Sequence, residues 1–67
     1  MYIHPDTLMT GMFIENTSTK EVFKVTFQNK FTVYLKNIST NEVIEEYKSD
    51  INHHKYRIVD IRGNYTI

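Results

Sequence analysis

The sequence predicts a small all-β domain, an antiparallel five-stranded barrel with one short helical turn. Composition favours strands, because Val, Ile and Thr supply 21 residues and Phe and Tyr nine more, whereas Ala is absent and Leu occurs twice. Apolar and polar residues also alternate in several short runs, as they do in half-buried strands. The connections between these runs are too short to hold a crossover helix, which indicates antiparallel neighbours.

The expected elements follow from this alternation and from the turn-forming residues between the runs. We expect strands at Met12–Glu15, Val22–Gln28, Phe31–Asn37, Val43–Lys48 and Tyr56–Ile61. Ser49 and Asp50 can cap a single helical or 3₁₀ turn before the last strand. Residues 1–67 then form one domain, with an N-terminal arm over 1–10 and a C-terminal tail over 62–67. Closure into a barrel would remove exposed sheet edges.

The hairpin between the second and third strands can be assigned by parity. A three-residue loop, Gln28-Asn29-Lys30, sets Phe27 opposite Phe31. It also sets Val25 opposite Val33, and residues directly opposite each other share a face. The apolar rows that then face inward are Phe23, Val25 and Phe27 with Phe31, Val33 and Leu35.

Two similar segments flank this hairpin and predict turns. ENTSTKEV covers residues 15–22 and NISTNEVI covers residues 37–44. Ser, Thr and Asn side chains in both can satisfy turn amides locally. For the second turn, loops of Ser39–Asn41 and Thr40–Glu42 both fit the pattern.

Several short motifs follow one another along the chain. A glycine precedes the first strand, and a Thr–turn–aromatic–x–Val step opens the second. An apolar-x-Val-x-Leu strand follows, and an aromatic-x-x-Val strand comes last. The residues in these places are Gly11, Thr19, Phe23, Val25, Val33, Leu35, Tyr56 and Val59. From Thr10 to Val59 the chain therefore resembles the small Src-homology-3-like barrels common among short phage and bacterial proteins.

The resemblance has consequences for the turns and for function. Lys20 and Asn41 stand where such barrels usually carry turn glycines, and the central loop is one residue longer. The resemblance implies no enzymatic activity, because barrels of this architecture mostly bind proteins or nucleic acids.

Size and charge limit the classes of function. A chain of 67 residues has a core that supplies only about 3–5 kcal/mol of net stability. It has no cysteine, so further support comes from tight packing or from a second chain, either a protein partner or a homodimer. The formal net charge is zero, which disfavours both binding to nucleic acid through many phosphates and attachment to a charged membrane.

Location is predicted from the N-terminus and from codon arithmetic. The segment MYIHPDTLMTGMF has no basic start and is interrupted by Pro5 and Gly11, so it resembles neither a signal peptide nor a membrane span. We expect a cytoplasmic protein. Ile, Asn, Lys, Tyr and Phe supply 29 residues and have AT-rich codons, which points to an AT-rich genome such as that of many phages. The cytoplasm would then be that of the host.

Histidines and carboxylates are the candidates for chemistry. His53 and His54 are adjacent, so on an extended chain they point to opposite sides and do not share a metal without other ligands. Their functional alternative is a pH-sensitive contact at a binding surface. Glu45, Glu46 and Asp50 form an acidic group. Acid–base catalysis would require burial in a cleft, which so small a chain has little volume to provide.

The acidic group is therefore expected to be solvated, with Glu45 or Glu46 facing Lys36 across the sheet. The sequence contains no Ser–His–Asp order, no glycine-rich phosphate loop and no cysteine nucleophile. We expect no enzymatic activity, no cofactor and no bound metal.

The segment 53–62 is the most basic stretch, with Lys55, Arg57 and Arg62 around Tyr56. Basic residues interleaved with an aromatic are typical of single-strand binding, so weak nucleic-acid binding is the alternative function. Tyr56, however, is opposite in phase to Lys55 and Arg57, which predicts that its ring points into the core.

The leading expectation is a non-enzymatic protein-interaction module, in its specific form a phage-encoded modulator or inhibitor of a host protein. Tyr34 is a large aromatic residue on a predicted solvent face, and such residues anchor protein interfaces. The alternative is that the N-terminal residues 2–9 cover this face. The expected contact residues are Tyr34, Lys36, Tyr47, His53 and His54. The sheet edge beside the last strand offers a second route, by strand addition.

Overall fold

The computed structural model describes residues 8–52 and 54–59, and they form one five-stranded antiparallel sheet with one 3₁₀ turn. The elements are β1 (Phe13–Asn16), β2 (Val22–Gln28), β3 (Thr32–Asn37), β4 (Val43–Tyr47), η2 (Lys48–Asp50) and β5 (Tyr56–Val59). The all-β prediction is confirmed, and the expected strands and helical turn all occur, with small shifts at the ends that the structure describes. Residues 60 and 61 of the expected last strand lie outside the described residues. The expected cap is wrong, because Ser49 and Asp50 lie inside η2 and no side chain caps the start of the turn. The expected C-terminal tail, 62–67, lies outside the described residues.

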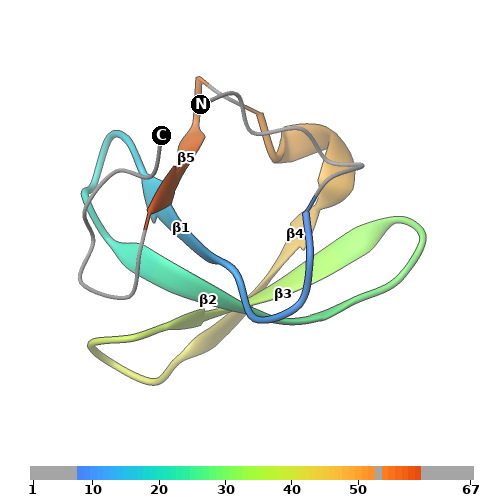
Figure 1. Cartoon of the computed structure of the whole chain (residues 1–67), viewed down its shortest axis with the longest axis horizontal. Helices are drawn as coiled ribbons and strands as arrows, with labels where there is room; N and C mark the ends of the chain where they lie inside the picture. The colour runs from blue at the N-terminus through green and yellow to red at the C-terminus, as the bar shows by residue number, and fades with distance from the viewer. Residues whose placement is uncertain (1–7, 53, 60–67) are drawn as a thin grey trace.

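The sheet is strongly curled, as Figure 1 shows. The strand order is β4-β3-β2-β1-β5, so β4 and β5 are the two edges of the described sheet. No backbone ladder joins these two edges among the described residues, and the closed barrel therefore stays a prediction. The core cluster consists of Leu8, Ile14, Phe23, Val25, Val33, Leu35, Ile51 and Tyr56.

The β2–β3 hairpin has a different register from the one the sequence predicts. Val25 lies opposite Leu35, and Phe27 lies opposite Tyr34, with an irregularity between Val25 and Phe27. The predicted pairings of Val25 with Val33 and of Phe27 with Phe31 are therefore wrong. Val25, Val33 and Leu35 do face inward as expected, but Phe27 is 57% exposed and Phe31 is 69% exposed.

The side chain of Asn29 accounts for this difference. Its Oδ1 accepts hydrogen bonds from the amides of Phe31 (2.9 Å) and Thr32 (2.8 Å). The amide of Asn29 also donates to the carbonyl of Thr32, which leaves a two-residue loop, Lys30-Phe31. A two-residue loop there would put the apolar rows of β2 and β3 on opposite faces. The extra residue at the irregularity, Thr26, is a β-bulge that restores the parity.

The turns after β1 and β3 have the same geometry. Asn16 Oδ1 accepts hydrogen bonds from the amides of Ser18 (2.9 Å) and Thr19 (3.1 Å). Asn37 Oδ1 accepts the equivalent bonds from the residues two and three positions later (2.8 and 3.2 Å). Lys20 (φ 67°) and Asn41 (φ 64°) both adopt the left-handed conformation that glycine favours. The two positions where the resemblance expects glycine thus have glycine-like backbones.

The loop of the β3–β4 turn differs from both of its predicted alternatives. The amide of Asn37 donates to the carbonyl of Glu42 (2.8 Å), so the loop is Ile38–Asn41, four residues long. The expected loops of Ser39–Asn41 and Thr40–Glu42 are therefore wrong. The observed loop changes the parity of β4 by one residue. It places Glu45 directly opposite Tyr34 on the outer face of the sheet.

Candidate protein-interaction surface

Three aromatic side chains lie on the outer face of the sheet, away from the core. Phe27 of β2 is opposite Tyr34 of β3, and their ring centroids are 5.7 Å apart. Tyr47 of β4 is opposite Thr32, one step along the same face from Tyr34. Tyr47 is 65% exposed. We call Phe27, Tyr34 and Tyr47 the outer aromatic patch.

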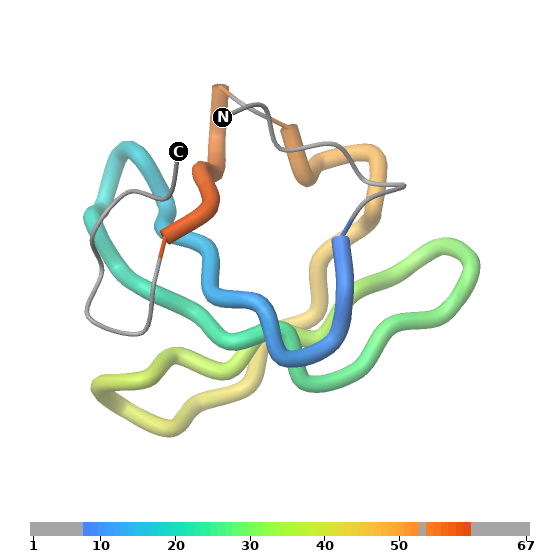
Figure 2. The backbone as a smooth tube through the Cα atoms, viewed as in Figure 1, coloured from blue at the N-terminus to red at the C-terminus, as the bar shows by residue number. Residues whose placement is uncertain are grey.

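The bulge at Thr26 creates this patch. In a regular strand Phe27 would follow Phe23 and Val25 into the core, but one extra residue turns it to the opposite face. Thr26 Oγ1 donates to the carbonyl of Tyr34 (3.2 Å), which ties the bulge to β3. Beyond it the hairpin loop reaches outward from the rest of the sheet (Figure 2). Sequence reasoning missed Phe27, and the available signal was Asn29, whose side chain sets the loop.

A tyrosine–glutamate hydrogen bond lies within the patch. The Tyr34 hydroxyl donates to Oε2 of Glu45 at 2.9 Å. This hydrogen bond, together with the negative charge of Glu45, raises the pKa of the Tyr34 hydroxyl. The phenol therefore stays neutral at physiological pH. This face is therefore an aromatic surface bordered by the acidic side chain of Glu45.

Lys36 lies on the same face, two residues along β3 from Tyr34. It is opposite Val43 of β4 and Lys24 of β2. The expectation that Glu45 or Glu46 faces Lys36 is therefore wrong. The reason is the four-residue loop, which shifts every pairing of β4. The patch thus has cationic side chains on one side and the Glu45 carboxylate on the other.

The N-terminal cover expected as an alternative falls mostly outside the described residues. Of residues 2–9 the structure describes Leu8 and Met9. Leu8 is buried in the core, where its carbonyl accepts a hydrogen bond from Gln28 Nε2 (2.8 Å), and Met9 is exposed. Neither side chain is among the ring contacts of the patch.

The expected histidine contacts do not join the patch. His54 lies in the segment between η2 and β5, and its carbonyl accepts a hydrogen bond from Thr17 Oγ1 (2.8 Å) of the β1–β2 turn. His53 lies outside the described residues. The outer face therefore unites Tyr34, Lys36 and Tyr47 but not His54.

The basic residues of the alternative site are engaged in ion pairs. Lys55 Nζ is 2.9 Å from Oε2 of Glu46, and Arg57 pairs with Glu15. Arg62 lies outside the described residues. A phosphate group would have to compete with these carboxylates for Lys55 and Arg57, which disfavours a nucleic-acid groove here.

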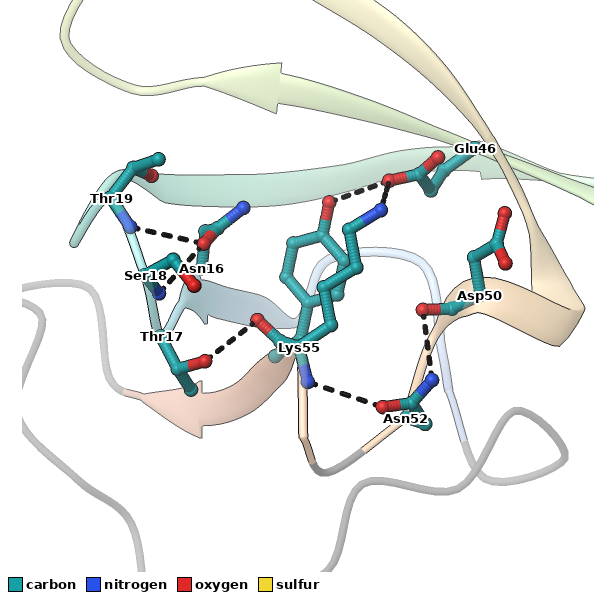
Figure 3. Close-up of polar contacts among 9 residues, drawn as sticks. Asn16, Thr17, Ser18, Thr19, Glu46, Asp50, Asn52 and Lys55 are labelled. Atoms are coloured by element: carbon teal, nitrogen blue, oxygen red, sulfur yellow. Dashed lines mark hydrogen bonds and ion pairs between the residues drawn. The ribbon is translucent and has the colours of Figure 1, made fainter.

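Glu46 belongs to a network on the inner face, so its expected solvation is wrong. Its Oε2 accepts hydrogen bonds from Lys55 Nζ (2.9 Å) and from the Tyr56 hydroxyl (2.8 Å), and Figure 3 shows the Lys55 contact. Tyr56 is buried, as predicted, and its ring packs edge-on against Phe23. These contacts join edge strand β4 to the start of edge strand β5.

The network also shifts ionisation. Burial alone would raise the pKa of Glu46, but the hydrogen bonds from Lys55 and Tyr56 outweigh it and lower that pKa. The bond to Glu46 raises the pKa of Lys55. Burial, followed by the hydrogen bond to Glu46, raises the pKa of Tyr56. The carboxylate is therefore held charged and the phenol neutral, which is a structural arrangement.

Residues 8–52 and 54–59 contain no group of three or more His, Cys, Asp or Glu side chains placed to hold a metal ion. None of the helical segments described has the length and apolarity needed to cross a membrane. Comparison with protein-family models, curated proteins and solved structures finds no match. The Src-homology-3-like resemblance stays a prediction from the sequence.

Proposed function

We propose that the chain is a non-enzymatic protein-interaction module that binds its partner through the outer aromatic patch. The observation that carries this proposal is the bulge at Thr26, which turns Phe27 out of the core and beside Tyr34. Large aromatic side chains gathered on an exposed face are typical anchors of protein interfaces. The flanking Lys36 and Glu45 supply a polar rim.

The free energy of the small domain supports this interpretation. Burying a phenylalanine side chain contributes about 1.5–3 kcal/mol relative to leaving it exposed. The core is expected to provide only about 3–5 kcal/mol of net stability. Leaving Phe27 exposed therefore gives up stabilisation that is large compared with this total. Contact with a second chain recovers that burial, because a ligand that binds only the folded state stabilises it.

The proposal includes the more specific expectations from the sequence. The codon bias and the resemblance to short phage proteins favour a phage-encoded modulator of a host protein, acting in the host cytoplasm. The partner itself is to be found by experiment. A homodimer through the same patch is the other form that this proposal takes.

Affinity capture from a host-cell lysate, with light scattering on the pure protein, tests the proposal. Tyr34→Ala and Phe27→Ala should each weaken the complex by about 1–3 kcal/mol. Ile38→Ala is the matched control, because Ile38 is an exposed apolar residue in the turn at the other end of β3. Its complex should keep the affinity of the parent protein. A monomer that captures nothing, or a complex indifferent to both patch substitutions, would refute the proposal.

A further inference from the structure

Strand β4 pairs with one neighbour only, β3, so the backbone groups of its alternate residues point away from the described sheet. In an antiparallel pair, successive residues point their N–H and C=O groups alternately toward the partner strand and away from it. The Glu42 carbonyl accepts from β3 and the Lys48 amide donates to the Phe31 carbonyl (2.8 Å), so the even-numbered residues point toward β3. Val43, Glu45 and Tyr47 therefore point their backbone groups outward, and within the described residues these groups have no hydrogen-bond partner.

The other edge of the sheet is less available. The Lys55 carbonyl accepts from Thr17, so Tyr56 is the next residue to point away from β1. Its amide already donates to the carbonyl of Asn52 (2.9 Å). β5 is an edge strand, as the sequence predicts. The hydrogen bond from Tyr56 to Asn52, however, already occupies the first amide of β5 that points away from β1. Among residues 8–52 and 54–59, β4 is therefore the edge on which an added strand would find bonding groups without a partner.

The charges of β4 indicate what such a strand must carry. Glu45 is exposed on the outer face, between Val43 and Tyr47, and forms no ion pair with a described residue. A second copy that paired antiparallel along the whole of β4 would set its own Glu45 directly against this one. Like charges directly opposite each other are destabilising, so these carboxylates act against self-association through β4. A strand with a cation at that position would instead gain an ion pair.

We propose that the open edge of β4 binds an extended segment of another protein that carries Lys or Arg between two apolar residues. The cation lies opposite Glu45, and the apolar side chains, two positions away on either side, lie against Val43 and Tyr47. The backbone of the segment extends the sheet by strand addition. This inference rests on the proposed function, since it specifies the partner of the same outer face, where Tyr34 donates to Glu45.

A short palindromic peptide, acetyl-Val-Thr-Lys-Thr-Val-amide, tests the inference, because it can add in either strand direction. The measurement is a titration followed by amide chemical shifts of the isotope-labelled protein. We expect shifts at Val43, Glu45 and Tyr47, and binding about five- to tenfold weaker for the same peptide with Glu in place of Lys. Glu45→Lys should reverse that preference. Val43→Pro removes an outward N–H to which no described residue bonds, and it should abolish the shifts while leaving the protein folded.

Each outcome separates this inference from the proposed function. Equal binding of the Lys and Glu peptides, or no shifts in β4, overturns the inference. If the Lys peptide shifts Phe27 and Tyr34 but leaves the β4 amides unchanged, the proposed function stands and the inference falls. The inference also falls, and the proposed function stands, if the partner captured from lysate is lost with Tyr34→Ala but retained in full by Val43→Pro and Glu45→Lys.

Discussion

Two neighbouring glutamates of β4 accept hydrogen bonds from tyrosine hydroxyls at nearly the same distance, yet in different surroundings. Glu45 accepts from Tyr34 at 2.9 Å on the outer face, and Glu46 accepts from Tyr56 at 2.8 Å on the inner face. Successive residues of a strand point to opposite faces, which is why the two carboxylates separate. Glu46 is 18% exposed and is also bound by Lys55, whereas Glu45 is exposed and has no cationic partner among the described residues.

The two pairs contain the same kind of hydrogen bond, so the difference in what they contribute to folding comes from burial. On the inner face the bond satisfies a buried phenol and connects the two edges of the sheet, so removing it leaves polar groups without partners. On the outer face water can replace either group, so the pair contributes little to folding. Its groups are instead free to exchange their bond for one with a partner.

The largest expected difference is between Glu46→Ala and Glu45→Ala. The first leaves the buried Tyr56 hydroxyl without its acceptor and should lower the free energy of unfolding by about 2–3 kcal/mol. The second, on the same strand, should change it by less than about 0.5 kcal/mol. Urea unfolding followed by circular dichroism measures both. Equal losses for the two variants would show that the inner network is no more important to folding than the outer pair.

Removing only the hydroxyl on the inner face should have a smaller effect. Tyr56→Phe keeps the ring and its edge-on contact with Phe23 but deletes a hydrogen bond to a charged group. We expect a loss of about 1–2 kcal/mol in the free energy of unfolding, since Glu46 keeps its bond from Lys55. Thermal unfolding of this variant beside the parent protein measures it. An unchanged midpoint would mean that water replaces the hydroxyl, contrary to the burial of Tyr56.

The strand pattern could be predicted from the sequence because alternation reports burial directly. Val25, Val33 and Leu35 are buried as expected, and Tyr34 is on the opposite face. Pairing between strands could not be predicted, since the same alternation fits loops of several lengths. In the β2–β3 hairpin the length is set by Asn29, whose side chain binds the loop amides.

Prediction of the site was limited for the same reason, because alternation does not show how the strands pair. Tyr34 and Tyr47 were accessible to sequence reasoning, but Phe27 reaches the outer face only through the bulge at Thr26. Glu46 meets Lys55 because the sheet curls and brings β4 toward β5. Neither a compensating bulge nor a contact between sheet edges leaves a local pattern in the chain.

Acid titration should show the contribution of the inner carboxylate, Glu46, as a smaller effect on stability. The pKa of Glu46 in the folded protein lies below its ordinary value of 4.5, so its contribution to stability is present above that pH and is lost as the pH falls through the folded pKa. Lys55 is partly exposed, so solvent screening keeps this contribution below about 1 kcal/mol. Urea unfolding between about pH 6 and 3 should show a shallower pH dependence for Glu46→Gln than for the parent. A pH dependence in Glu46→Gln as steep as that of the parent would contradict the assignment.

The smallest expected effect on folding belongs to Tyr34→Phe, which removes the outer hydroxyl and keeps the ring. The lost bond to Glu45 lies in solvent, so the free energy of unfolding should change by less than about 0.5 kcal/mol. The contact between this ring and Phe27 remains, and the exposed aromatic area is nearly unchanged.

If the ring is the anchor of the interface, Tyr34→Phe should bind the captured partner almost as well as the parent, whereas Tyr34→Ala should not. Calorimetric titration of the two variants with the same partner makes the comparison. If Tyr34→Phe lost as much affinity for the partner as Tyr34→Ala, the anchor of the interface would be the hydroxyl with its hydrogen bond to Glu45, not the aromatic ring.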